Sequence, residues 1–139
     1  TELAAIAPNI RTLDMQASGF EVEKTAQVVS DWITKYGASL TAIVIADDYA
    51  QLTGAVEACQ KAGRGDITIV AAGNSKAGMD AVKAGQCHAI TYQSAESDGA
   101  MPIKMAADWF NSKSVELVRY LPKHIIKADN VDLFLPAQW

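Results

Sequence analysis

The feature that most constrains the fold of this chain is a regular alternation of apolar runs with segments of helical spacing. Near-continuous apolar runs at residues 41–46, 67–72 and 87–92 recur roughly every 20–25 residues, as the spacing of βαβ units requires. After each run, apolar residues recur at the three- and four-residue spacing of a helix. Strand–helix alternation of this kind predicts right-handed crossovers and a parallel sheet.

The expected elements follow from the same periodicity. Strands are expected at 9–16, 41–46, 67–72 and 87–92, and the second and third of these should be covered on both faces because they are almost wholly apolar. Helices should start at Val22, at Tyr49, shortly before Met79 and after residue 94, and the first and third should end near Gly37 and Gly85. The prediction is an α/β fold with a doubly wound parallel sheet in a three-layer αβα arrangement.

Length and composition restrict the class of protein. A chain of 139 residues suits one domain with a real core. The net charge of −4, without a run of Lys and Arg, argues against a nucleic-acid partner. No apolar stretch approaches the roughly 20 residues of a membrane-spanning helix. No signal-peptide pattern is present either, although a mature secreted chain would look the same.

The two cysteines, Cys59 and Cys87, do not form a recognisable motif. They lie too far apart for a CxxC site and are too few for a disulfide framework. Cys59 shares a helical stripe with Leu52 and Val56, which favours a buried thiol that acts as a small hydrophobic side chain. A disulfide between the two cysteines is the alternative.

Polar residues gather directly after the expected strands. They lie at 16–20, 47–48, 73–74 and 92–93. In a parallel sheet these loops share the carboxyl edge, where ligands of open α/β sheets bind. We therefore expect a binding site at this edge.

The residues in these loops do not assemble a recognisable catalytic or metal centre. Neither His88 nor His124 has a nucleophile elbow near it, and no phosphate-binding glycine motif occurs. A receiver-like phospho-acceptor domain would fit the length and place acids at strand ends, but it needs a lysine after the last strand, where Tyr92 and Gln93 stand. We expect no enzyme activity, no metal and no cofactor.

The same residues suit reversible binding of a polyhydroxylated molecule. Asp47 can accept hydrogen bonds from two neighbouring hydroxyls, while Asn74 and Gln93 can both donate and accept. Phe20 can offer a flat apolar face to a sugar ring. Each residue also has a structural interpretation: Asp48 as a helix N-cap, Asn74 as a turn residue, and Phe20 as a hydrophobic staple. Together, at one edge of one sheet, they favour a binding site.

The stretch "AIVIADDYAQLTGAVEACQKAGRGDITIVAAGNSKAGMDAVKAGQCHAITYQ" resembles the sugar-binding proteins of ABC importers, the ribose-binding-like type I periplasmic family. The tail "KHIIKADNVDLF" is similar to that family's closing segment. The resemblance places the family's ligand-stacking aromatic on Phe20, its polar strand-end residue on Asp47 and its hinge-side glutamine on Gln93. The family's next aspartate has no match, since Gly73 stands there with Asn74 beside it. Tetroses, pentoses, hexoses and polyols therefore all stay open as ligands.

The resemblance also implies an organisation. Residues 1–93 correspond to the carboxy-terminal lobe without its first strand and most of its first helix, residues 94–127 cross to the amino-terminal lobe, and residues 128–139 return. The implied partners are a sugar or polyol, a membrane permease, and either the missing lobe or a second copy of the chain. The implied location is the bacterial periplasm, or the cell exterior through a lipid anchor. The same two-lobed core serves LacI-type repressors as a sugar-effector domain, which is the main alternative.

Overall fold

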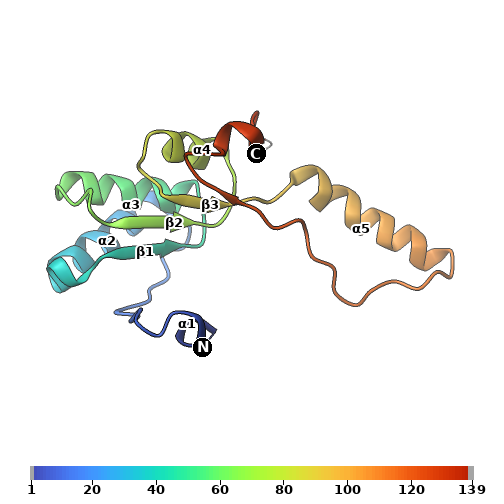
Figure 1. Cartoon of the computed structure of the whole chain (residues 1–139), viewed down its shortest axis with the longest axis horizontal. Coiled ribbons are helices and arrows are strands. Elements are labelled where there is room, and N and C mark those ends of the chain that lie inside the picture. Colours follow the sequence, from blue (N-terminus) through green and yellow to red (C-terminus); the bar gives the residue numbers. More distant parts are fainter. Residues whose placement is uncertain (1, 138–139) are drawn as a thin grey trace.

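A computed structural model describes residues 2–137 of the chain, apart from the side chains of Glu2 and Ala4, and it contains a four-stranded sheet with helices packed against it (Figure 1). The strands are β1 (Ala42–Ile45), β2 (Thr68–Ala71), β3 (Ala89–Thr91) and β4 (Ile125–Ile126). The helices are α1 (Glu2–Ile6), α2 (Val22–Tyr36), α3 (Ala50–Lys61), α4 (Lys76–Lys83) and α5 (Ala95–Phe110), with short 3-10 turns η1 (Gly37–Ser39) and η2 (Val131–Phe134).

The sheet confirms the predicted α/β class. The strands lie in the order β1-β2-β3-β4, and β1, β2 and β3 are parallel, with Val44 opposite Val70 and Ala71 opposite Ile90. Strand β4 pairs with β3 in the antiparallel direction, which the sequence did not predict. The carboxyl ends of β1, β2 and β3 therefore meet at one edge, as expected.

The core lies on one side of β1 rather than on both. Ile43 and Ile45 are buried against the helices, whereas Val44, which points to the opposite face, is 81% exposed. The expectation that residues 41–46 would be covered on both faces is therefore wrong for the described residues. Alternation along a strand sends neighbouring side chains to opposite faces, and helices α2 and α3 pack together on the covered one.

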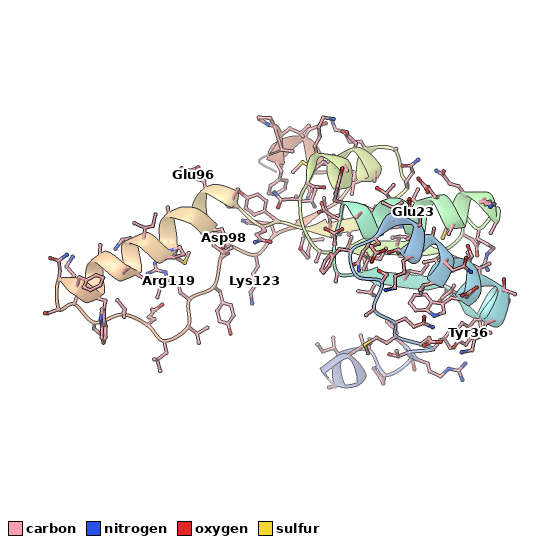
Figure 2. The ribbon with its side chains drawn as sticks, turned by 180° about the vertical axis from the view of Figure 1, so that it is seen from behind. Glu23, Tyr36, Glu96, Asp98, Arg119 and Lys123 are labelled. Carbon is pink, nitrogen blue, oxygen red and sulfur yellow. The ribbon has the colours of Figure 1, made fainter. Side chains whose placement is uncertain are left out.

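The strand expected at 9–16 does not form. Residues 10–18 are irregular, and the hydrogen-bonded neighbour of β1 is β2 alone among the described residues. The segment is held from the side instead: Tyr36, at the end of α2 (Figure 2), donates its hydroxyl to Asp14 Oδ2 at 2.8 Å, and Lys35 Nζ reaches the same oxygen at 3.1 Å. A strand needs a pairing partner as well as an alternating sequence, and residues 2–137 provide none for this segment.

Helix α5 and the chain that follows it project from the body as an arm (Figure 1). No residue of α5 is buried. Phe110 at its end and Leu117 in the segment that follows are large apolar side chains that face solvent. Figure 2 shows Glu96 and Asp98 on the helix, and Arg119 and Lys123 on the returning segment. Within residues 2–137, none of the helices is both long and apolar enough to cross a membrane.

Both cysteines are free thiols buried in the core, so the disulfide alternative is wrong. Cys59 lies on the buried face of α3 with Leu52, which confirms the interpretation of its thiol as a small hydrophobic side chain. Burial raises the pKa of both thiols above the ordinary value, which keeps them protonated and unreactive at neutral pH.

Candidate functional site

A cleft of about 360 Å³ lies at the carboxyl edge of the sheet. Its walls are residues 46–49 after β1, residues 72–75 after β2, and Gln93 after β3. The structure therefore brings together three of the four predicted site residues, Asp47, Asn74 and Gln93. Each comes from a different strand, as the carboxyl edge of a parallel sheet requires.

Asp47 is half-buried and lies at the start of α3. Its Oδ2 accepts a hydrogen bond from the backbone N–H of Gln51 at 3.1 Å, which satisfies one of the free amides of the first helical turn. Its other oxygen has no hydrogen bond from the part of the chain that the structure describes. The carboxylate can therefore hold the helix and still accept from a ligand hydroxyl.

Asp48 does not cap α3, contrary to the structural interpretation made from the sequence. Its side chain is only 5% exposed and reaches across to the loop after β2, where Oδ2 accepts from the Ser75 backbone N–H at 2.6 Å. The Ser75 hydroxyl also contacts the Asp48 carbonyl oxygen at 3.3 Å. Burial raises the pKa of Asp48 above its ordinary value, and the negative charge of Asp47 adds to that rise, while the Ser75 bond opposes it.

Asn74 joins two loops of the cleft. The side chain is 1% exposed, and its Oδ1 accepts from the backbone N–H of Gln93 at 2.9 Å. Its Nδ2 is buried without a hydrogen-bond partner in the described residues. The Gln93 side chain is exposed and donates to Asp98 at the start of α5, at 3.3 Å.

Phe20 stands on a neighbouring loop and is not among the residues that line the cleft. It has φ of 58° and a side chain that is 64% exposed, so it is not buried as a staple against α2. The loop is tied to the cleft through the buried Ser18, whose Oγ accepts from Gln51 Nε2 at 2.8 Å and from Thr25 Oγ1 at 2.7 Å. Gln51 also bonds Asp47, so one residue links both loops.

The sequence reasoning missed Tyr49 and Ser18 in this region and assigned Asp48 the wrong role. Tyr49 lines the cleft with a side chain that is 64% exposed, although its spacing with Leu52 and Val56 had assigned it to the helix face. Ser18 gave no signal of its own. The role of Asp48 was detectable from Gly73 and Gly78, because a Cβ built at either glycine would overlap the Asp48 carboxylate.

The charged groups at this edge do not form a metal centre. No group of three or more His, Cys, Asp or Glu side chains with metal-binding geometry occurs within residues 2–137. Asp14 is bonded to Tyr36 and Lys35 and does not line the cleft. The arrangement offers hydrogen-bond donors and acceptors around a cleft, with an exposed aromatic ring at its rim.

Comparison with known proteins gives consistent matches. The sequence pattern of the periplasmic binding protein domain family matches residues 2–114. A xylitol-binding protein of Mycolicibacterium smegmatis is 24% identical over 132 residues, which cover 95% of this chain and 38% of that protein.

Solved structures agree in fold. An ABC transporter periplasmic solute-binding protein of Actinobacillus succinogenes with bound D-allose has a TM-score of 0.83 at 21% identity, covering 95% of this chain and 47% of that one. An ABC transporter solute-binding protein of Bacillus halodurans with bound myo-inositol has a TM-score of 0.79 at 20% identity, covering 96% of this chain and 46% of that one. The chain thus spans less than half the length of these relatives.

Proposed function

The chain belongs to the periplasmic binding protein domain family, and we propose that it is part of a non-catalytic solute-binding protein that reversibly holds a sugar or a polyol. The observation that carries this proposal is the cleft at the carboxyl edge of the sheet, where Asp47, Asn74 and Gln93 meet. The relatives described above are a xylitol-binding protein and two solute-binding proteins with bound D-allose or myo-inositol, and all three molecules present several hydroxyl groups.

Each side chain has a role in this proposal. Asp47 accepts from ligand hydroxyls through the oxygen that does not bond Gln51, and charge-assisted bonds of this kind are the stronger ones. Phe20 and Tyr49 present exposed rings that stack on the apolar face of the ligand. Gln93 lies where the chain leaves the lobe, and its backbone is held by Asn74.

The arm, which consists of α5 and the segment that runs from it to β4, supports a two-lobed protein. It projects from the body and exposes Ile103, Trp109, Phe110, Leu117 and Tyr120. A run of exposed apolar side chains this long is typical of an interface rather than of a free surface. We propose that the amino-terminal lobe covers it and closes over the ligand, and that a second copy of the chain covers it when that lobe is absent.

Light scattering tests this part of the proposal. The chain should self-associate as its concentration rises, and replacing Phe110 and Leu117 with serine should reduce the association. A chain that stays monomeric at millimolar concentration and does not bind a hydrophobic dye would contradict it.

The remaining partners follow from the family. We propose that the whole protein works in the bacterial periplasm, or outside the cell on a lipid anchor, and delivers its solute to the membrane permease of an ABC importer. The LacI-type alternative is not favoured, because the two solved relatives described above are solute-binding proteins of ABC transporters.

The ligand proposal is tested by NMR titration of the chain with xylitol, D-allose and myo-inositol at millimolar concentrations. At least one of them should shift the amide signals of Asp47, Tyr49 and Gln93. Asp47→Asn should weaken that response about tenfold or more, since a charged acceptor contributes about 1.5–3 kcal/mol. Asp31→Asn is the matched control, because Asp31 is an exposed residue of α2 that bonds Gln27 outside the cleft. Shifts confined to another surface would refute the assignment of the cleft.

A further inference from the structure

We infer that Asp48 is a positioning residue of the cleft, which fixes the loop between β2 and α4 so that Asn74 stays bound to the Gln93 backbone. The inference rests on the proposed function, because it concerns the shape of the proposed ligand cleft. Asp48 is assigned no contact with the ligand, since its side chain is 95% removed from solvent.

The first step is the tie between β1 and the next loop. Asp48 follows β1, and its carboxylate accepts from the Ser75 N–H at 2.6 Å, a short charge-assisted bond in a buried setting. The Ser75 hydroxyl contacts the Asp48 carbonyl oxygen at 3.3 Å and also accepts from the Gly78 N–H at 3.1 Å, as the N-cap of α4. Asp48 therefore holds Ser75, the residue at which the loop ends and α4 begins.

The second step is the space that the loop leaves for this carboxylate. Gly73 precedes Asn74 and adopts φ of 120°, and Gly78 lies in the first turn of α4. A Cβ at either position would overlap an oxygen of the Asp48 carboxylate, so the carboxylate would have to move. The loop is therefore closed around Asp48 from two sides.

The third step carries the position onward to β3. Asn74 lies next to Ser75, and its Oδ1 accepts from the Gln93 N–H at 2.9 Å. Gly73 N–H donates to Thr91 Oγ1 at 3.0 Å. Two hydrogen bonds thus join the loop to the end of β3. Without the Asp48 contact the loop can move, and neither Asn74 nor Gly73 is then held in position to form its bond. The cleft walls after β1, β2 and β3 would then move independently.

The test compares amide hydrogen exchange in the unmodified chain and three variants. In Asp48→Ala, exchange at the Ser75 and Gln93 amides should rise at least tenfold more than at the β1–β2 ladder amides. Asp48→Asn keeps an acceptor oxygen in place and should restore much of the protection. Leu52→Ala removes a buried side chain of α3 outside the loop and should accelerate all these amides by a similar factor. A uniform rise in Asp48→Ala would overturn the inference.

Binding of the probes distinguishes this inference from the proposed function. If xylitol, D-allose or myo-inositol binds the unmodified chain, its affinity should fall at least tenfold in Asp48→Ala and recover in Asp48→Asn. Faster exchange at Gln93 with unchanged affinity would overturn the positioning role. If none of the probes binds even the unmodified chain, the proposed function fails for them, and the exchange pattern still decides whether Asp48 holds the loop. Should Asp48→Ala not fold, Gly78→Ala displaces the carboxylate instead and is measured in the same way.

Discussion

Replacing Gly78 with alanine should destabilise the protein, although alanine is the better helix former. A methyl group at this position would overlap Asp48 Oδ2 and lie 2.7 Å from its Cγ. The helical preference for alanine contributes a gain of about 1 kcal/mol. Displacing the buried carboxylate from the Ser75 N–H loses about 1.5–3 kcal/mol, and the crowding adds about 1–3 kcal/mol. The expected net loss is therefore roughly 1.5–5 kcal/mol.

Chemical unfolding followed by circular dichroism measures this loss. Gly99→Ala is the matched control, because Gly99 lies in α5 and its added Cβ would meet nothing within 4 Å. That variant should be neutral or more stable. In an Asp48→Ala background, Gly78→Ala should be at most half as damaging, because only the Cβ of residue 48 remains, at 3.0 Å. An unchanged or higher unfolding midpoint for Gly78→Ala alone would refute the close packing around Asp48.

Two further predictions concern the scaffold. Gly54→Ala should destabilise the chain by about 2 kcal/mol or more. The new Cβ would overlap the Val22 carbonyl oxygen and lie 3.0 Å from Ala26 N, and these backbone atoms cannot rotate away as a side chain can. An unfolding midpoint at or above that of the unmodified chain would contradict this prediction. Hydrogen bonds from Lys104, and to a smaller extent from Lys113, lower the pKa of the Asp108 carboxyl from 3.8 to about 2. These contacts therefore stabilise the end of α5 above pH 4 and are lost as the pH falls toward 2. A carboxyl NMR titration should show that midpoint, Lys104→Ala should raise it, and a midpoint near 3.8 in the unmodified chain would exclude the contacts.

The parts of the fold that depend on periodicity were predictable. Helix α2 was expected from Val22 to about Gly37 and spans Val22–Tyr36, and α4 was expected to stop at Gly85 and ends at Lys83. Both predictions succeed because an apolar stripe of period 3.6 is a local property of the sequence. The strand predicted at 9–16 does not form, because a strand also depends on a pairing neighbour that the segment itself does not specify.

The site was predictable as a location but not in detail. Parallel strands bring their carboxyl ends together, so Asp47, Asn74 and Gln93 converge whatever their individual roles. The shared edge of the sheet does not by itself show that Asp47 faces the cleft while Asp48 is buried against the next loop. Burial alternates through Ile43 and Ile45, and an extended strand would bury Asp47 next; β1 ends at Ile45, however, and it is Asp48 that the turn buries.

The signal that separates the two acids lies elsewhere in the sequence, in "GNSKAG" at 73–78. A glycine in the first turn of a helix is unfavourable by about 1 kcal/mol relative to alanine, so its presence at position 78 calls for a neighbour that fills the space. A second glycine at position 73, with positive φ, faces the same neighbour from the other side. That neighbour is the buried carboxylate of Asp48, which accepts a hydrogen bond from the backbone N–H of Ser75, a residue between the two glycines. The adjacent acids thus divide two tasks, because Asp48 fixes the second loop while Asp47 stays at the cleft with an oxygen to spare.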